Sequence, residues 1–287
     1  MNGTPSVPPG IVSPLAATQP GVRVVKIGGR VQSSAALPSL VAAAWRARPG
    51  ALVVVHGGGD EVSRLQRLTG GEPTFVGGRR VTREADLETL RMALSGSANK
   101  RLVSALVALG VPAVGISGED GGMLEATPDD PALGLAGRPT AVRPALLELL
   151  LGAGWLPVVS PVGRNAAGGG AINVNGDDAA AAIAAALGAG ELLLAADVAG
   201  VLVGGGVVAR LTTADAAALV AEGVAGGGMA AKLEAASSAL AAGVARVRIS
   251  DALAVADITR GTTIVPAGAP ALDAGADAPV LQAASAA

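Results

Sequence analysis

Short apolar runs alternate with helix-forming stretches through most of this chain, and glycines follow several of the runs. Val22–Ile27 and Ala51–Val55 are each followed by glycines within two residues, and further runs of this kind are Val111–Ile116, Leu156–Ser160, Glu191–Ala195 and Val244–Ile249. Short buried strands separated by helices predict an α/β fold with a mainly parallel sheet and helices on both faces. Ligands bind such sheets at the carboxyl ends of the strands, so the glycines there are the first candidates for a site.

The intervals between the apolar runs have helical composition or turn chemistry. We expect a Gly-rich hairpin near Pro73–Val81. The predicted helices are Leu37–Ala47, a helix from about Asp60, a long stretch Arg83–Leu109, Pro144–Leu151, Asp178–Leu187, Ala214–Glu222 and Met229–Ala242. Residues 1–21 and 266–287 show no period and are rich in small residues and proline, so they are predicted to be a disordered arm and a flexible tail.

Composition excludes several classes of protein. The chain of 287 residues has no cysteine and one histidine, which argues against disulfides, thiolate metal sites and a zinc site. Its formal net charge is −2 with mixed signs, and no basic stripe suggests a nucleic-acid partner. No apolar run approaches the roughly 18 residues that span a bilayer, and the N-terminus lacks a signal-peptide pattern. We therefore expect a cytoplasmic protein with small-molecule partners.

The stretch VVKIGGR places Lys26 near the end of a predicted strand and directly before two glycines, Gly28 and Gly29. Backbone N–H groups of glycine can approach an anion closely, and a lysine beside them suits phosphate binding. The alternative is a tight β-to-α turn with a solvent-reaching lysine. Neither the Walker A pattern nor G-x-G-x-x-G after the first strand is present.

The stretch VVVHGGGD contains the only histidine, His56, followed by three glycines. We interpret the glycines as a backbone anion site for a carboxylate or phosphate, with a wide turn as the alternative. His56 has no evident carboxylate beside it to orient the ring. We therefore predict a structural role for the histidine and a binding role for Gly58 and Gly59.

Four polar residues, Asn173, Asn175, Asp177 and Asp178, stand directly before an alanine-rich helix. Helix capping needs only one of them, so the excess indicates a site. Amide side chains could bind a substrate carboxylate or acyl group, and a carboxylate could hold lysines in position by ion pairing.

Two further stretches offer positive charge. In GGGMAAKLEAA, Lys232 follows a Gly-rich helix start, and a positive helix end plus a lysine can form an anion site. In GGRRVT, Arg80 could clamp a carboxylate through two hydrogen bonds. Exposed lysine and arginine side chains are the alternatives.

Two separated lysines, an aspartate, glycine-rich turns and no evident base together favour phosphoryl transfer. This chemistry depends on positioning and on positive charge at the transferring phosphoryl group. A carboxylate acceptor is already ionised at pH 7 and needs no base. The scarcity of histidine therefore fits a carboxylate acceptor better than a hydroxyl acceptor.

Seven motifs in order make the chain resemble the amino acid kinase family and, within it, the acetylglutamate kinases of arginine biosynthesis. The motifs are K-x-G-G (Lys26–Gly29), H-G-G-G (His56–Gly59), R-V-T (Arg80–Thr82), N-K-x-L (Asn99–Leu102), N-V-N-G-D (Asn173–Asp177), D-V-x-G-V (Asp197–Val201) and G-G-M-x-x-K (Gly227–Lys232). The resemblance implies a three-layer αβα sandwich around a mainly parallel sheet, with an amino-acid-binding and dimerising lobe at 22–165 and an ATP-binding lobe at 166–265.

The resemblance also implies roles for single residues. Lys26 and Lys232 would contact the transferring phosphoryl group, and Asp177 would orient both lysines. The residues expected to hold acetylglutamate are Gly58, Gly59, Arg80 and Asn173. The residues expected to bind ATP are Gly28, Gly29, Asp197, Val198, Gly200, Val201, Leu202, Gly228 and Met229, with Mg²⁺ held mainly by phosphates and water rather than by a protein ligand.

Departures from the family pattern leave alternatives open. Gly176 stands where acetylglutamate kinases commonly have alanine, which leans toward kinases for carrier-linked glutamate or aminoadipate, whereas Asn175 and Gly59 lean away from them. The carrier-linked or differently acylated acceptor is kept as the alternative. Ala196 stands where serine is frequent. The proline-rich arm does not suit the extra helix of hexameric, arginine-inhibited members, so we expect a homodimer. A non-catalytic small-molecule sensor with the same fold is the alternative of another class.

Overall fold

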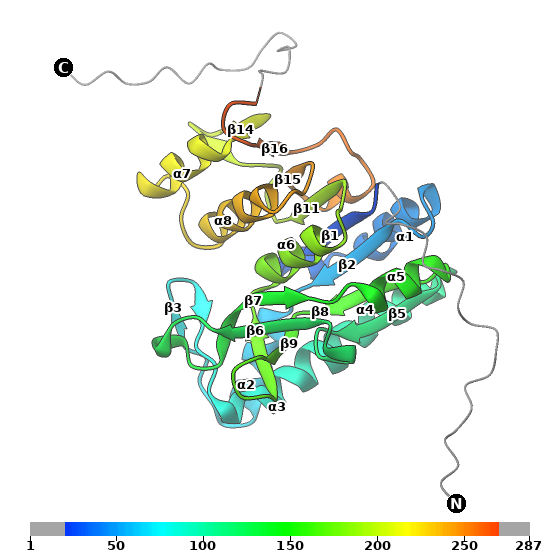
Figure 1. Cartoon of the computed structure of the whole chain (residues 1–287), viewed down its shortest axis with the longest axis vertical. Coiled ribbons are helices and arrows are strands. Elements are labelled where there is room, and N and C mark those ends of the chain that lie inside the picture. The colour runs from blue at the N-terminus through cyan, green and yellow to red at the C-terminus, as the bar shows by residue number, and fades with distance from the viewer. Residues whose placement is uncertain (1–20, 270–287) are drawn as a thin grey trace, which may run out of the picture.

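The computed structural model describes residues 21–269, so the predicted arm (1–21) lies outside this part except for Gly21, and the predicted tail (266–287) lies outside it beyond residue 269. An eight-stranded sheet forms the centre of the molecule (Figure 1). Its strands, in spatial order, are β14 (Arg210–Thr212), β16 (Thr262–Val265), β15 (Val247–Ser250), β11 (Glu191–Ala195), β1 (Arg23–Ile27), β2 (Leu52–His56), β8 (Leu156–Ser160) and β5 (Ala113–Ser117).

Neighbouring strands of the large sheet run parallel, except that β15 and β16 are antiparallel. Strands β2, β8 and β11 are buried along their whole length, as continuous Val and Leu runs require in a sheet covered on both faces. The predicted mainly parallel sheet is confirmed. Strand β1 lies between β11 and β2, and its residue Lys26 is in register with Leu194 and Val55.

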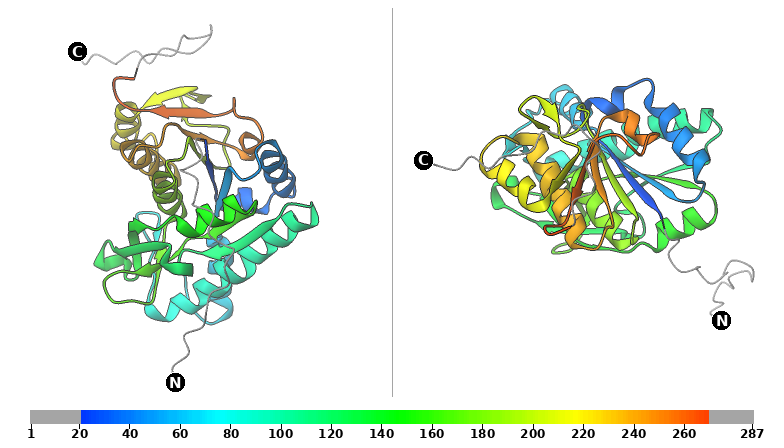
Figure 2. Two further views of the ribbon diagram at one scale, coloured as in Figure 1. Left: turned by 45° about the vertical axis from the view of Figure 1, so that its right-hand side comes forward. Right: turned by 90° about the horizontal axis from the view of Figure 1, so that it is seen from above.

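Helices cover both faces of this sheet (Figure 2). One face carries α6 (Gly176–Ala186), α7 (Thr213–Ala221) and α8 (Gly227–Ala241), and the other carries α1 (Leu37–Ala47) and α4 (Asn99–Ala108). Helix α6 buries a row of alanines against β1 and β2, and small side chains let the helix approach the sheet closely. The three-layer αβα sandwich is confirmed.

A second sheet, not predicted from the sequence, closes on itself in the order β10-β7-β6-β9. Its strands are β6 (Leu124–Pro128), β7 (Ala136–Val142), β9 (Val162–Asn165) and β10 (Ala171–Val174). They contain proline, glycine and charged residues and so lack a clear apolar period. Close crossing of the strands requires glycine at 137, because a Cβ there would lie 2.3 Å from the carbonyl oxygen of Thr127.

The predicted helical stretch Arg83–Leu109 is helical in the structure but consists of three segments. These are α3 (Glu84–Arg91), a π-helical segment η2 (Met92–Ala98) and α4. π-helical turns inside helices are frequent at functional sites. Here η2 packs beside the glycine turn that follows β2, where a Cβ at Gly58 would lie 2.7 Å from Leu94 Cδ2.

Short elements complete the fold. Helix α2 (Gly59–Leu68) follows β2, and α5 (Ala145–Gly152) precedes β8. The predicted hairpin near Pro73–Val81 is present as β3 (Phe75–Val76) and β4 (Arg79–Arg80). The remaining elements, none of them predicted, are the strands β12 (Leu202–Val203) and β13 (Gly206–Val207) and the 3-10 turns η1 (Gly29–Ser33), η3 (Asp120–Gly122), η4 (Pro131–Leu133) and η5 (Ala252–Val255).

Candidate active site

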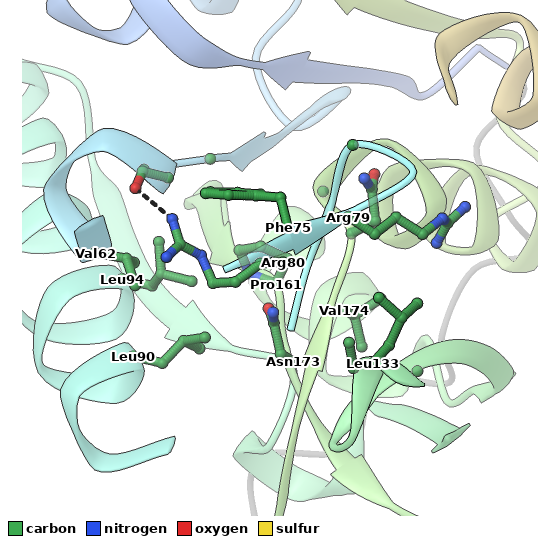
Figure 3. Close-up of a pocket in the computed structure, with 18 of the residues that line it drawn as sticks. Val62, Phe75, Arg79, Arg80, Leu90, Leu94, Leu133, Pro161, Asn173 and Val174 are labelled. Carbon is green, nitrogen blue, oxygen red and sulfur yellow. Dashed lines mark hydrogen bonds between the residues drawn. The ribbon is translucent and has the colours of Figure 1, made fainter. Parts of the chain in front are cut away.

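A cavity of about 260 Å³ opens at the carboxyl ends of β1 and β2 (Figure 3). It lies where parallel sheets bind ligands. Six residues to which the sequence assigned a catalytic or binding role contribute to its lining, namely Lys26, Gly29, Gly58, Gly59, Arg80 and Asn173. Apolar side chains form another part of the lining, from Val62, Phe75, Leu90, Leu94, Leu133 and Pro161.

Asp177 lies between the two lysines that the sequence singled out. Nζ of Lys26 is 3.0 Å from Oδ1 of Asp177, and Nζ of Lys232 is 3.2 Å from Oδ2. The three groups come from β1, α6 and α8, and all are largely buried. One carboxylate therefore fixes two ammonium groups, and the trio keeps a net positive charge.

Burial and charge act against each other in this trio. Burial alone would raise the pKa of Asp177, but the neighbouring ammonium groups outweigh it and keep that pKa below its ordinary value. Burial lowers the pKa of Lys26, Asp177 opposes this shift, and the charge of Lys232 adds to it. The protonated form of Lys26 therefore depends on the carboxylate of Asp177.

Glycines leave room for the Lys26 side chain. A Cβ at Gly28 would lie 2.4 Å from Lys26 Nζ, and a Cβ at Gly176 would lie 3.1 Å from Lys26 Cε. The N–H of Gly28 is bonded to the Ala195 carbonyl at 3.3 Å, whereas Gly29 lines the cavity. The missing side chain of Gly28 therefore leaves space for the Lys26 ammonium group, and its expected contact with phosphate stays a prediction.

The polar residues at the start of α6 make different contacts. The Asn175 side chain caps the helix by accepting from the N–H of Asp177 at 2.8 Å. Asn173 lines the cavity and donates from Nδ2 to Thr82 Oγ1 at 2.9 Å. Asp178 pairs with Arg79 of the β3–β4 hairpin, with 2.8 Å between Oδ2 and Nη1.

The glycine turn after β2 exposes backbone where side chains would block it. Gly58 has φ +147°, a value that L side chains rarely adopt, and Gly59 begins α2 with its N-terminal end at the cavity. The positive end of a helix and free N–H groups favour a carboxylate or phosphate there.

His56 is fully buried beneath this turn. Its Nδ1 lies 2.7 Å from the Gly57 carbonyl, which can only accept, so Nδ1 carries the proton and Nε2 accepts from Asn99 Nδ2 at 3.1 Å. Burial lowers the pKa of His56 to about 4. A neutral imidazole outside the cavity lining matches the predicted structural role.

Arg80 is held on one side of the cavity by uncharged acceptors. It donates to the Gly59 carbonyl at 2.8 Å, to Ser63 Oγ at 2.7 Å and to Gln66 Oε1 at 2.5 Å. Its guanidinium also lies 4.8 Å from the centre of the Phe75 ring, a cation–π contact visible in Figure 3. Burial lowers the pKa of Arg80, but a guanidinium stays charged at any working pH.

Apart from Gly29, the residues expected to bind nucleotide lie outside the cavity lining. The segment of Asp197, Val198, Gly200, Val201 and Leu202 follows β11, and the N–H of Val201 donates to Thr262 Oγ1 at 2.8 Å. Gly228 and Met229 lie in the first turn of α8, the helix that carries Lys232. Their expected role stays a prediction.

Several polar residues in or near the cavity were not predicted as site residues, among them Arg79, Gln66 and Asp86. A signal for Gln66 is present in the sequence, because it stands four residues after Val62, on the same face of a helix. Arg79 and Asp86 look like ordinary surface charges until the fold brings their partners close.

The described part of the chain, residues 21–269, contains no group of three or more His, Cys, Asp and Glu side chains that could hold a metal ion. Among the helices of these residues, none combines the length and the hydropathy that spanning a bilayer requires.

Comparison with known sequences places these features in a family. The model of the amino acid kinase family matches residues 21–251. Acetylglutamate kinase of Rubrobacter xylanophilus is 48% identical over 224 residues, which cover 77% of this chain and 85% of that protein. Acetylglutamate kinase of Geobacillus stearothermophilus is 43% identical over 229 residues, which cover 79% of this chain and 88% of that protein.

Solved structures share the fold. N-acetylglutamate synthase from Neisseria gonorrhoeae, complexed with coenzyme A and N-acetyl-glutamate, is 27% identical with a TM-score of 0.72 and covers 86% of this chain and 60% of its own. Carbamate kinase from Giardia lamblia bound to AMP-PNP is 15% identical with a TM-score of 0.67. The match covers 87% of this chain and 99% of the carbamate kinase chain. The second likeness supports the fold alone.

Proposed function

The chain belongs to the amino acid kinase family, and we propose that it is an acetylglutamate kinase. It transfers the γ-phosphoryl group of ATP to the γ-carboxylate of N-acetyl-L-glutamate, giving N-acetylglutamyl 5-phosphate and ADP for arginine biosynthesis. The observation that carries the proposal is the Asp177 carboxylate held between Nζ of Lys26 and Nζ of Lys232 at 3.0 and 3.2 Å.

The two lysines supply positive charge where phosphoryl transfer needs it. During transfer, charge spreads over the oxygens of the phosphoryl group, and ammonium groups fixed in advance stabilise that charge without reorganising. We assign Lys26 and Lys232 as catalytic residues that contact the phosphoryl oxygens, and Asp177 as the residue that positions both. Gly29 presents backbone N–H to phosphate, with Gly28 making room for Lys26.

The cavity takes the amino-acid substrate. We assign the carboxylate next to the acetamide to Arg80 and the acetyl and amide groups to Asn173 and the apolar wall at Leu90 and Leu94. The N–H groups of Gly58 and Gly59 face the reacting carboxylate. This places the acceptor next to Lys26, which lines the same cavity.

ATP approaches from the side of α8 and β11. We assign the nucleotide to the segment from Asp197 to Leu202 and to the α8 start at Gly228 and Met229. Mg²⁺ would arrive with ATP, held mainly by phosphate oxygens and water, and would neutralise part of the phosphate charge.

The proposal extends to organisation and location. We assign amino-acid binding and dimerisation to residues 22–165 and ATP binding to 166–265. We further infer a cytoplasmic homodimer acting on small molecules, without nucleic-acid or membrane partners. Light scattering should give twice the chain mass of 27.5 kDa, and a mass equal to one chain would contradict the dimer.

A substrate panel with a hydroxamate trap for acyl phosphate tests the function. ATP-dependent hydroxamate should form with free N-acetyl-L-glutamate and, at equal concentration, far less with succinylated glutamate, aminoadipate or glutamate linked to a carrier protein. Product with only a succinylated or tethered acceptor would replace the proposal by the alternative kinase. No turnover with any acceptor, in a protein that binds ATP, would favour a sensor.

A further inference from the structure

Gln66 is a buried polar side chain with no assigned part in the reaction. It stands on the inner face of α2, four residues after Val62, and is 2% exposed. Such a position usually carries an apolar residue, because a buried amide destabilises the fold unless its donors and acceptor are paired. The pairing of this amide therefore shows what the residue does.

The amide connects two charged groups of opposite sign. Its Nε2 donates to Oδ1 of Asp86 at 3.0 Å, and its Oε1 accepts from Nη1 of Arg80 at 2.5 Å. Asp86 lies in the first turn of α3 and also accepts from the backbone N–H and the guanidinium of Arg83. These hydrogen bonds, above all those from the Arg83 guanidinium, lower the pKa of Asp86 to about 2, so the carboxylate is ionised under working conditions.

An ionised carboxylate can only accept hydrogen bonds, whereas a guanidinium can only donate them. The NH₂ group of Gln66 must therefore face Asp86, and its oxygen must face Arg80. The amide has one orientation, and this orientation gives Arg80 an acceptor at a defined place.

Because the groups that hold Arg80 are uncharged, the charge of its guanidinium remains available for a substrate carboxylate. Within residues 21–269, no carboxylate lies within ion-pair distance of Arg80, and its three acceptors from Gln66, Gly59 and Ser63 are uncharged. A carboxylate in place of the amide would compete directly with a substrate carboxylate for the same guanidinium.

We propose that Gln66 is a positioning residue for substrate binding, which aims Arg80 into the cavity and keeps the charge of Asp86 one side chain away. The inference rests on the proposed function, because it takes the ligand of Arg80 to be the carboxylate of acetylglutamate. Gln66 acts through Arg80 and does not touch the reacting atoms.

Gln66→Glu tests the proposal through its pH dependence. While the introduced carboxyl group is protonated, it reproduces the amide, with an O–H that donates to Asp86 and a carbonyl that accepts from Arg80. As pH rises, this carboxyl group ionises, repels Asp86 and neutralises Arg80. The ratio of the variant's KM for acetylglutamate to the wild-type KM should rise with pH between pH 5.5 and 8.5, reaching at least about tenfold. The values of kcat and of KM for ATP should stay within about threefold.

Leu68→Glu is the matched control. It places the same carboxylate on the same helix at a side chain that is 70% exposed, and its KM ratio should stay flat over this pH range. Gln66→Leu gives a second measurement that does not depend on ionisation. It should raise KM for acetylglutamate at all pH values with kcat retained.

Each outcome decides the inference. The inference is overturned if the KM ratio of Gln66→Glu does not change with pH, or if Gln66→Leu has the wild-type KM. In either case the proposed function still stands as long as the wild type turns over acetylglutamate. A loss confined to kcat in a folded variant also overturns the inference. No turnover of acetylglutamate by the wild type, in contrast, overturns the proposed function and this inference together.

Discussion

Asp177 is the residue on which the charge balance of the site depends. Without its carboxylate, two buried ammonium groups would face each other with no anion between them. Burial and Lys232 both lower the pKa of Lys26, and Asp177 is the largest influence that opposes them, ahead of Asp178. A single carboxylate therefore holds both the position and the protonation of the lysine.

Asp177→Asn should lower kcat by about 100-fold, because an amide keeps the shape but not the charge that orients the lysines. It should also move the alkaline limb of the pH profile of kcat to lower pH, since the pKa of Lys26 falls further. Steady-state kinetics from pH 6 to 10 measure both effects. The control is Asp215→Asn in α7; an unshifted alkaline limb in the Asp177 variant would contradict the assignment.

His56 affects stability through its burial. Its folded pKa of about 4 lies below its ordinary value of 6.5, so the unfolded chain binds more protons between these pH values. The stability that the neutral histidine preserves is complete above about pH 6.5 and is lost as pH falls toward 4. His56 is the only histidine in the chain, so no second imidazole contributes between pH 4 and 6.5.

Wild-type protein should therefore lose about 2 kcal/mol of unfolding free energy between pH 7 and pH 5 through this group. His56→Asn should be less stable at pH 7 but should lose much less on the same change of pH. Urea unfolding at the two pH values measures this. Equal losses in both proteins would show that His56 is not the group responsible.

At the scale of elements, the β3–β4 hairpin joins segments far apart in the chain. Its turn glycines Gly77 and Gly78 have φ of +55° and +76°, values typical of a tight hairpin turn. Alternation along β4 sends Arg80 to α2 and Arg79 to Asp178 at the start of α6. The hairpin thus connects one wall of the cavity to the helix that carries Asp177.

Arg79→Leu should raise KM for acetylglutamate about fivefold, which corresponds to about 1 kcal/mol, with a smaller change in kcat, because the mostly buried ion pair to Asp178 holds the hairpin in place beside the cavity. Arg79→Leu combined with Asp178→Asn should recover part of the loss, since no buried carboxylate is left unpaired. Kinetics of the two single variants and the double variant form the cycle. Strict additivity would exclude coupling between the two side chains.

At the scale of the whole molecule, a charge cluster lies at the end of the sheet opposite the site. Glu191 begins β11 and pairs with Arg23 of β1 at 2.9 Å and with Arg248 of β15. Burial lowers the pKa of Arg23, and both arginines also donate to carbonyl groups in and after η5, including that of Ala254. The cluster joins three adjacent strands to the segment that follows β15.

Glu191→Gln should lower the unfolding free energy by about 3 to 5 kcal/mol, because it leaves two buried arginines without their carboxylate. KM for both substrates should stay near wild type, since the cluster lies at the amino ends of β1 and β11. Urea unfolding and kinetics test the two statements. Arg246→Gln is the control, because Arg246 is 45% exposed and lies 3.6 Å from Glu191, so its loss should change stability by less than about 1 kcal/mol.

Local sequence was enough to predict the framework. Apolar runs of five or six residues predicted β1, β2, β8 and β11, because burial on both faces demands continuous apolar side chains, and glycines after the first two runs marked the strand ends. The motifs predicted the family, and they brought Lys26, Asp177 and Lys232 together as candidates. These features can be predicted from residue type and order because each strand and the turn that follows it are adjacent in the sequence.

Tertiary structure alone decided the second sheet and the polar pairings other than those of Asp177 with the two lysines. The closed sheet β10-β7-β6-β9 lacks a clear apolar period, since its strands carry proline, glycine and charge. The links from Asp86 through Gln66 to Arg80, and from Arg79 to Asp178, join segments up to 99 residues apart. Hydrogen bonds and ion pairs act over a few ångströms in space, and a sequence records no such distances between residues remote along the chain.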